Sequence, residues 1–471
     1  MKILIKNGHL IDPSSDLDGL FDILISGEKI EDVIPSAKRV GDLPCRTEIP
    51  SVASLPRDDV KRHCEEARRR SFTAFRTGSA ISDVVLDATN LIISPGFIDL
   101  HVHFREPGFT HKETLESGAR CAIAGGFSTV CCMANTKPVV DTPELVKWIK
   151  ERSREIGLAE ILPVAALTIG QQGSKLTAME PLAKAGAAAF SDDGGGGVIN
   201  YQIMKEGLLR AKKLNLPVID HCEDPNLVAD GVMNAGKVSL QLGLAGNPAD
   251  AETLQIERDI KLAKETGSHL HIAHLTTKGG VELIRRAKMD GVNVTTEVTP
   301  HHLTLSENDI TKRPYDTNLK IAPPLRKEED VEALKAGLMD GTIDIFATDH
   351  APHSFDEKSL PFSMAPFGVT GLETALPIYL TLVEKGILSL RQVVEKLSSA
   401  PAKLLGKKDH SIKKGGRATL TIFDPSASFT INAKNSFSKS LNNPFDGWKV
   451  KGRVLDVFIN GKHLFKNGVL Q

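Results

Sequence analysis

Histidine and aspartate side chains recur at the ends of short apolar segments in this chain. The stretch GFIDLHVHFREPGFTHKE, residues 96–113, places His101 and His103 two residues apart at the end of an apolar run and before an Arg-Glu-Pro-Gly turn. Alternate residues of a strand face the same side, so both imidazoles share one face, with Asp99 one layer deeper. Paired imidazoles of this kind are candidate ligands of a metal ion.

Further side chains of the same type end other apolar segments. They are Asp192, Asp193, His221, His274 and Asp349. Burying so many carboxylates and imidazoles without compensating cations would be costly. Mixed imidazole and carboxylate ligation suits zinc and its neighbours, and six ligands with one shared carboxylate suit two ions better than one. The pattern therefore predicts a dinuclear metal site.

Several of these positions have neighbours of the same type. His269 and His271 share one strand face, whereas His274 lies on the other face and nearest the carboxyl end, so His274 is the predicted ligand. Asp193, beside the glycines at 194–197, is preferred to Asp192 as the more exposed of the two, although strand parity separates them only weakly. The histidines interpreted as structural are His301, His302 and His350.

Such ligands need elements that bring them together. From residue 97 onward, eight apolar segments alternate with amphipathic helical stretches, which is typical of repeated βα units. Eight units over about 250 residues predict a (β/α)8 barrel, in which the carboxyl ends of the strands form one active-site mouth. The predicted strands are residues 97–103, 128–133, 161–167, 187–193, 216–223, 269–275, 292–300 and 343–350. Stretches such as 113–126 and 281–291 predict helices that end in glycine.

The two chain ends have a different pattern. Residues 1–34 contain two strand-like runs, KILIKNGHLID and FDILISGEKIEDVI, and residues 418–471 contain further runs with Asn-Gly turns. Neither flank alone has enough apolar face for a stable sheet, so we predict one small β-sandwich built from both ends; two separate appendages are the alternative. The predicted domains are residues 1–94, 95–400 and 401–471, the first and last forming the sandwich.

Residues 35–83 lack sustained hydrophobic periodicity. We predict an irregular surface insertion here, with a short helix near Arg57–Arg70. As an alternative, its arginines could bind a phosphate or a partner.

Composition limits the class of partner. With 58 Lys and Arg against 59 Asp and Glu, no global field favours nucleic acid or an anionic membrane. The apolar runs are shorter than the ~20 residues of a membrane span, and the N-terminus lacks a signal-peptide pattern. Six cysteines without paired spacing fit a reducing compartment and make thiolate metal sites improbable. We expect a cytoplasmic protein that acts on a small molecule.

Five segments together resemble the amidohydrolase superfamily, and within it the bacterial dihydroorotases. They are GFIDLHVHFREPG, FSDDG, HCED, NLKIAPPLR and ATDHAPH, and the similarity spans nearly the whole chain outside residues 35–83. The resemblance implies reversible cyclisation of N-carbamoyl-L-aspartate to L-dihydroorotate in pyrimidine synthesis, with two zinc ions (Zn2+) per subunit.

The resemblance also implies a role for each matching ligand. One zinc would take His101, His103 and Asp349, the other would take His221 and His274, and Asp193 would bridge them, with Asp349 also acting as general acid and base. Many relatives bridge with a carbamylated lysine. Here residues 190–193 are Phe-Ser-Asp-Asp, which indicates a carboxylate bridge.

Substrate contacts follow from the same resemblance. Arg105 resembles the family's carboxylate clamp, and a guanidinium matches a planar carboxylate in a bidentate manner. The remaining implied contacts are His103, Asn135, Asn318, His353, Phe367 and Gly368. Ala134 replaces the family's usual proline, which loosens the loop before Asn135 without removing its amide. As alternatives, Arg105 could pair with Glu106 or Glu113, and the two asparagines could be turn residues.

The sequence is also compatible with three other functions. Allantoinases and hydantoinases or dihydropyrimidinases hydrolyse related cyclic amides on the same scaffold, but Arg105 favours a substrate that carries a carboxylate, which hydantoin lacks. An inactive scaffold for aspartate transcarbamoylase would be expected to lose ligands, and this chain keeps all six. A homodimer, and association of an active enzyme with that transcarbamoylase, are compatible with the sequence.

Overall fold

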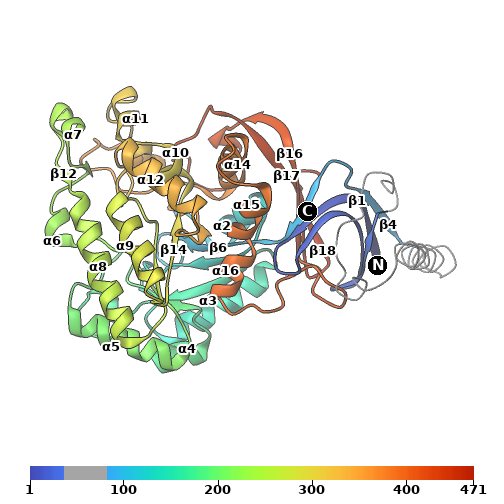
Figure 1. The fold of residues 1–471 in the computed structure, drawn as a ribbon, viewed down its shortest axis with the longest axis horizontal. Coiled ribbons are helices and arrows are strands. Elements are labelled where there is room, and N and C mark those ends of the chain that lie inside the picture. The colour runs from blue at the N-terminus through green and yellow to red at the C-terminus, as the bar shows by residue number, and fades with distance from the viewer. Residues whose placement is uncertain (37–81) are drawn as a thin grey trace, which may run out of the picture.

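The computed structural model describes residues 1–36 and 82–471. Figure 1 shows a barrel wrapped by helices, with a β unit at one side that contains both chain termini. The helix predicted near Arg57–Arg70 lies outside the described residues, as does the predicted insertion except for residues 35–36 and 82–83. No helix in the described ranges is long and apolar enough to cross a membrane.

Eight parallel strands of the described chain form the barrel and pair in chain order. A parallel bridge between Val102 and His350 connects the last strand's end to the first strand and closes the ring. The predicted (β/α)8 barrel is therefore confirmed. Its strands are β6 (Phe97–Val102), β7 (Phe127–Cys132), β8 (Glu160–Ala165), β9 (Ala189–Phe190), β10 (Val218–Asp220), β13 (Leu270–Ile272), β14 (Val294–Val298) and β15 (Ile345–Phe346).

Several barrel strands are shorter than the sequence predicted. The apolar runs continue past the last ladder residue, because the chain there turns toward the barrel mouth instead of pairing. As a result, His103, Asp193, His221, His274 and Asp349 each lie one to three residues beyond a strand end. These short extensions bring side chains from five strands to one rim.

Amphipathic helices surround the strands (Figure 1). The helices predicted at 113–126 and 281–291 are α2, which ends at Gly125, and α9, which is followed by Gly291 at φ 73°. The main outer helices are α2 (Leu115–Ala124), α3 (Pro143–Ile156), α4 (Met179–Ala185), α5 (Tyr201–Leu214), α8 (Ala249–Thr266), α9 (Lys278–Met289), α12 (Glu328–Met339), α14 (Ala375–Glu384), α15 (Leu390–Leu397) and α16 (Ser399–Leu404).

Shorter elements occupy the loops at the barrel mouth. They are α6 (Pro225–Val228), β11 (Met233–Asn234), α7 (Lys237–Leu242), β12 (Gly246–Asn247), α10 (Pro300–Thr304), α11 (Glu307–Lys312) and α13 (Phe355–Lys358).

The two chain ends share one sheet. Within the described residues it has nine strands, and antiparallel pairing of β5 with β16 joins the N-terminal to the C-terminal part. Isoleucines and leucines from both ends enclose one core, as the predicted sandwich requires, and two separate appendages are excluded. The strands are β1 (Lys2–Asp12), β2 (Leu17–Ser26), β3 (Lys29–Pro35), β4 (Val84–Asp87), β5 (Ile92–Pro95), β16 (Leu420–Thr430), β17 (Lys449–Ile459), β18 (Lys462–Lys466) and β19 (Val469–Leu470).

Turn residues set the register of this sheet. The Asn-Gly pairs at 460–461 and 467–468 both have positive φ and connect β17 to β18 and β18 to β19, as their sequence predicts. One predicted run, FDILISGEKIEDVI, is wrong as a single strand because Gly27, at φ 58°, turns the chain between β2 and β3. The division at residues 94 and 400 stays a proposal.

The barrel and the terminal sheet share a core. Phe97 on β6 is fully buried, and its ring centroid lies 5.8 Å from that of Phe127 on β7 and 6.0 Å from that of Phe423 on β16. These three rings join the first two barrel strands to the sheet that both termini build.

We therefore expect Phe97→Ala to destabilise the protein strongly. Loss of a fully buried ring that packs on both units should lower the free energy of unfolding by about 3–5 kcal/mol. Urea unfolding measures the loss. Phe355→Ala is the control, because this ring is 74% exposed and should change stability by less than about 0.5 kcal/mol. Equal effects of the two substitutions would contradict the shared core.

Candidate metal centre

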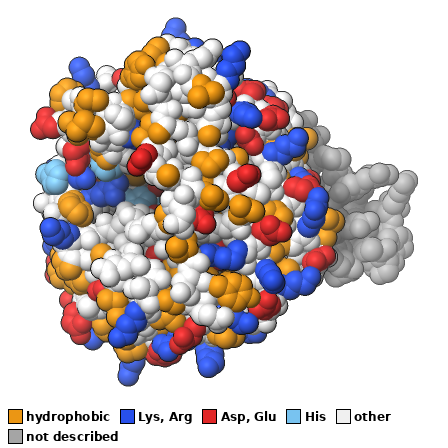
Figure 2. All heavy atoms as spheres, turned by 90° about the vertical axis from the view of Figure 1, so that its left-hand side faces the viewer, with side chains coloured by type: hydrophobic (Ala, Val, Ile, Leu, Met, Phe, Trp, Pro, Cys, Tyr) orange, Lys and Arg blue, Asp and Glu red, His pale blue; other side chains and the backbone are white. Residues whose placement is uncertain are grey.

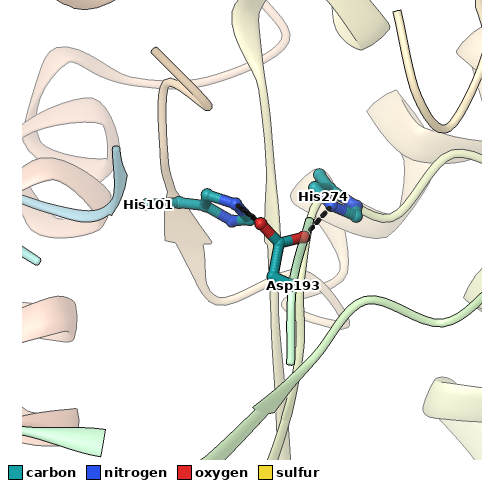
Figure 3. A group of neighbouring side chains, drawn as sticks. All are labelled: His101, Asp193 and His274. Atoms are coloured by element: carbon teal, nitrogen blue, oxygen red, sulfur yellow. Dashed lines mark hydrogen bonds and ion pairs between the residues drawn. The ribbon is translucent and has the colours of Figure 1, made fainter. Parts of the chain in front are cut away.

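Asp193 lies at the centre of a group of histidines at the barrel mouth. Its Oδ2 is 3.2 Å from the Nε2 atoms of both His101 and His103. Its Oδ1 is 3.0 Å from His221 Nδ1 and 3.5 Å from His274 Nε2. Figure 3 shows how His101 and His274 approach this carboxylate from two sides. One carboxylate thus faces four imidazoles through its two oxygens.

Asp349 adds a second carboxylate on one side of the group. Its Oδ1 lies 3.1 Å from His103 Nε2 and 3.7 Å from His101 Nε2. On the opposite side, His221 Nδ1 is 2.9 Å from His274 Nε2. The structure therefore brings together all six residues that the sequence singled out as ligands. Five are buried, and His221 keeps 15% of its side chain exposed.

The backbone holds three site residues in an unusual conformation. Arg105, His274 and Asp349 have φ values of 52°, 27° and 45°. Residues other than glycine rarely adopt positive φ, and such strain persists only where the surroundings enforce it. Here the positive φ values occur where the chain turns sharply after a strand, and these turns direct the three side chains into the barrel mouth.

The cluster is held by mutual charge compensation. Burial alone would raise the pKa of Asp193, but His101, His221 and His274 outweigh burial and hold this pKa well below its usual range. The pKa of Asp349 is likewise lowered, because its contacts with histidines outweigh burial. Burial opposes protonation of His101, yet the neighbouring carboxylates raise its pKa well above normal. Both carboxylates are therefore ionised at neutral pH.

The donor atoms fit divalent cations. His274 Nδ1 is buried and has no hydrogen-bond partner among the residues that the structure describes. The facing nitrogens of His221 and His274 can approach to 2.9 Å only with a proton or a cation between them. Imidazole nitrogens with carboxylate oxygens are a ligand set that zinc and related ions prefer.

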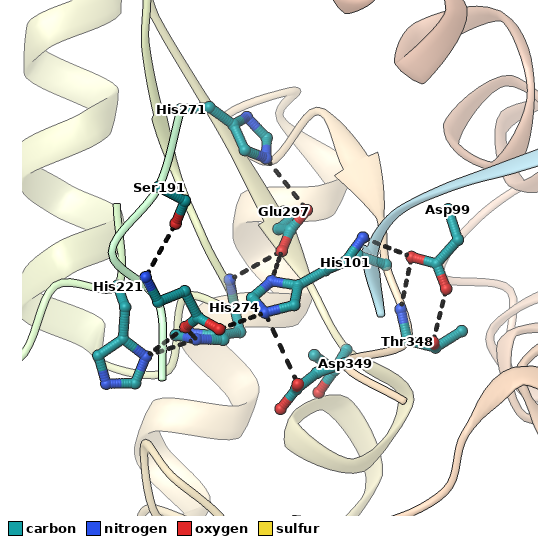
Figure 4. A network of polar contacts seen from close by, with 12 residues as sticks. Asp99, His101, Ser191, His221, His271, His274, Glu297, Thr348 and Asp349 are labelled. Carbon is teal, nitrogen blue, oxygen red and sulfur yellow. Dashed lines mark hydrogen bonds and ion pairs between the residues drawn. The ribbon is translucent and has the colours of Figure 1, made fainter. Parts of the chain in front are cut away.

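Glu297 on β14 was missed in the sequence. It is fully buried, and its Oε1 is 2.7 Å from His101 Nδ1 while its Oε2 is 3.1 Å from His271 Nε2. The backbone N–H of His274 also donates to Oε1, at 3.4 Å. Figure 4 shows Glu297 next to His101, on the side of the imidazole away from Asp349. Burial favours the neutral acid, but His101 and His271 lower the pKa of Glu297 to about 2.

Other ligand-type histidines are oriented in the same way. Glu223 Oε2 is 3.0 Å from His221 Nε2, and Asn135 Oδ1 is 2.8 Å from His103 Nδ1. A partner on the outward ring nitrogen fixes the tautomer and orientation of a metal-binding imidazole. Two features of the sequence could have indicated these partners. They are the lone glutamate in the apolar run VNVTTEV, which is Glu297, and the glutamate of HCED, which is Glu223.

Arg105 lies beside this group and is buried. Its Nε donates to Pro352 O at 3.1 Å, and its Nη2 is 3.2 Å from His353 Nε2. Burial, followed by the charges of Arg105 and Lys112, holds the pKa of His353 far below its usual value, so His353 is neutral and accepts from Arg105. Among the described residues Arg105 pairs with no carboxylate, and the salt bridges considered with Glu106 and Glu113 are not formed.

The other predicted substrate residues lie on loops that follow barrel strands β14 and β15. Asn318 is half-buried on a short turn at 317–319. Phe367 keeps 37% of its surface exposed, and the N–H of Gly368 donates to Lys320 O at 3.0 Å. Figure 2 shows a hollow on one face of the molecule in which histidine and basic side chains gather.

The aspartate and histidines that were not chosen as ligands form hydrogen bonds elsewhere, except for one nitrogen of His301. Asp192 accepts from the N–H and hydroxyl of Thr168 and does not contact the histidines. The remaining partners are Thr295 for His269, Thr299 and Pro323 for His302, and Glu113 and Gly371 for His350. His301 Nε2 is buried with no hydrogen-bond partner in the described chain.

A family model and curated relatives both match this chain to dihydroorotases. A family model described as dihydro-orotase-like matches residues 90–280. The chain is 41% identical over 466 residues to a dihydroorotase of Pelobacter propionicus, covering 99% of this chain and 100% of the relative. It is 46% identical over 384 residues to a dihydroorotase of Caldanaerobacter subterraneus, covering 81% of this chain and 88% of the relative.

Two solved structures with the same fold are named as hydantoinase or dihydropyrimidinase. The L-hydantoinase (dihydropyrimidinase) from Arthrobacter aurescens matches with a TM-score of 0.81 at 23% identity, covering 100% of this chain and 97% of that one. The dihydropyrimidinase from Brevibacillus agri matches with a TM-score of 0.77 at 22% identity, covering 100% and 96%. At this identity the likeness establishes the fold alone.

We expect Glu297→Gln to weaken metal binding. The amide cannot accept from His101 and His271 as a carboxylate does, so the affinity for zinc should fall about 10- to 100-fold. Competition with a chromophoric chelator measures it. Glu307→Gln is the control, because Glu307 is also buried but accepts from Asn234, at 2.6 Å, away from the histidine group. Wild-type zinc affinity in Glu297→Gln would contradict the orienting role.

Proposed function

The chain belongs to the dihydroorotase family, and we propose that it catalyses the reversible cyclisation of N-carbamoyl-L-aspartate to L-dihydroorotate, with loss of water, in pyrimidine synthesis. The observation that carries the proposal is the buried Arg105, which pairs with no carboxylate in the described chain and lies beside six ligand-type side chains. Both the open and the cyclic form of this substrate carry the α-carboxylate, which takes no part in ring closure.

Arg105 would bind that carboxylate. A buried guanidinium is stabilised by a planar anion that accepts two parallel hydrogen bonds. His353 already accepts from one of its nitrogens and would hold the fork in orientation. Asn318 and the Phe367–Gly368 backbone would contact the rest of the substrate. Asn135, which accepts from His103, would lie between the substrate and this metal ligand.

Two zinc ions fit the remaining residues. We assign His101, His103 and Asp349 to one ion, His221 and His274 to the other, and Asp193 as the shared carboxylate. Bound zinc would lower the pKa of a water and polarise the ring carbonyl. The four imidazoles around Asp193 support a carboxylate bridge, so a carbamylated lysine is not required.

Asp349 would carry the proton. In the hydrolytic direction it takes a proton from the attacking water and delivers it to the amide nitrogen as the ring C–N bond breaks. In the biosynthetic direction it takes a proton from the attacking carbamoyl nitrogen and gives it to the departing carboxylate oxygen, which leaves as water after that oxygen has taken a second proton from solvent. Its lowered pKa, caused by His103 and His101 against burial, keeps the group ionised and ready to accept.

Asp349→Asn should abolish turnover while largely retaining metal. Removal of a general base typically costs about 10²- to 10⁴-fold in rate, and an amide oxygen can still ligate. Cyclisation of carbamoyl-aspartate and metal content are measured on the same preparation, before and after chelation and zinc replacement. Asp192→Asn is the control, since Asp192 contacts Thr168 and should keep its turnover. Substantial activity in Asp349→Asn would refute the proton-carrying role.

Arg105→Met tests the substrate class. Loss of the guanidinium should raise the KM for carbamoyl-aspartate by about 100-fold, the usual scale for an unpaired buried charge. The surface variant Arg152→Met serves as control. Dihydroorotate, allantoin and hydantoin are assayed with the wild type, and a preference for either of the latter two would overturn the assignment.

The alternative functions receive less support. Hydantoin has no carboxylate for Arg105, and the resemblance to hydantoinases is one of fold. An inactive scaffold would not need six ligand-type side chains in contact. A homodimer, association with aspartate transcarbamoylase and a cytoplasmic location stay predictions.

A further inference from the structure

A buried asparagine from the C-terminal part of the chain connects two segments at the barrel mouth. Asn442 is 3% exposed, and its Nδ2 donates to Ala351 O at 3.2 Å and to Gly368 O at 3.0 Å. Its Oδ1 accepts from the N–H of His353 at 3.2 Å. One side chain thus holds residues 351–353 on one side and Gly368 on the other.

The first of these segments orients Arg105. The guanidinium donates to Pro352 O through Nε and meets His353 Nε2 through Nη2. Both partners lie in the stretch that Asn442 holds by Ala351 and His353. The direction of the Arg105 fork therefore depends on the position of this stretch.

The second segment approaches the first closely. Gly368 has φ 128°, and a Cβ there would lie 2.8 Å from both the Cβ and the carbonyl oxygen of Ala351. Lys358 Nζ also donates to Gly368 O, at 2.9 Å, but its other bond is to Pro366 O within the same loop. The two segments also meet through their backbones, because the N–H of Ala351 donates to Val369 O at 2.8 Å. Asn442 adds side-chain bonds to both of them at the adjoining residues.

Asn442 itself lies on a firmly anchored segment. Ser440 Oγ donates to Lys112 O at 2.8 Å, and Ser438 Oγ donates to Glu113. Asn443 Nδ2 contacts Thr370 at 3.4 Å. Residues 438–443 are therefore bonded to the loop that follows Arg105 and can serve as a fixed support.

We propose that Asn442 is a positioning residue that sets the separation between the Arg105–His353 pair and the Phe367–Gly368 backbone, and thereby the affinity for the substrate carboxylate. This inference rests on the proposed function. Because Asn442 bonds to none of the six ligand-type side chains, its loss should act on substrate binding and leave metal content and the chemical step nearly unchanged.

The test compares Asn442→Ala with Asn443→Ala in the full-length, zinc-loaded enzyme. Asn443 is the matched control, because it is a buried asparagine at the next position whose contacts are with Thr370, Thr374 and Phe445. We expect Asn442→Ala to raise the KM for carbamoyl-aspartate and dihydroorotate about 10- to 100-fold, the scale of a displaced positioning group. Metal content should equal that of the wild type, and kcat should change little.

Asn442→Asp is a second variant that keeps the acceptor for His353 but removes both donated bonds, so its KM should also rise. If Asn442→Ala does not fold, the KM relative to that of the wild type is measured on Asn442→Asp. A wild-type KM in the folded variant, or an equal rise in Asn443→Ala, would overturn the positioning role. The wild-type rate reports on the proposed function and the KM ratio reports on Asn442, so the two can fail separately.

Discussion

The carboxylate of Asp193, buried among four imidazoles, is the interaction on which the barrel mouth depends. Neither the acid nor the histidines could be buried alone at acceptable cost. Each lowers the cost of the other, as the opposite pKa shifts of Asp193 and His101 indicate. Imidazole binds a metal only in its neutral form, so cations at this site would replace protons as the balancing charge. Metal binding, protonation and stability are therefore coupled in this protein.

Closure of the barrel gives this cluster its geometry. The bridge between Val102 and His350 sets the ends of the first and last strands side by side, which places Asp349 next to His103. Beneath them, the carboxyl of Asp99 accepts from the N–H and hydroxyl of Thr348, across 249 positions in the chain. Burial raises the pKa of Asp99 to about 7 against these hydrogen bonds. Two distant parts of the sequence are thus joined directly below the ligand-type side chains.

Local sequence patterns predicted the order of the barrel strands and the polar side chains at their carboxyl ends. Eight apolar runs separated by helical stretches were sufficient for the barrel, and histidine or aspartate side chains at or near the ends of five of them were sufficient for the rim on which the six side chains lie. The choice between Asp192 and Asp193 was weak because it depends on Thr168, from the preceding loop, which binds Asp192. Glu297 and Asn442 were missed because their partners are distant in sequence and no local pattern encodes those contacts. Glu223 was also missed, although its partner His221 lies only two positions away. The true lengths of β9 and β15 likewise depend on where pairing stops.

The mouth is supported from two independent directions. Glu297 and Asp99 hold the deeper layer of ligand-type residues from within the barrel. The upper layer, where Arg105, His353 and Gly368 lie, is held by the C-terminal segment that follows β16. The terminal β unit is itself joined to the barrel through the rings of Phe97 and Phe423. Because the two layers use different supports, changes in the upper layer can alter what is bound without disturbing the ligand layer below. This separation allows one barrel to keep its chemistry while its rim selects the substrate.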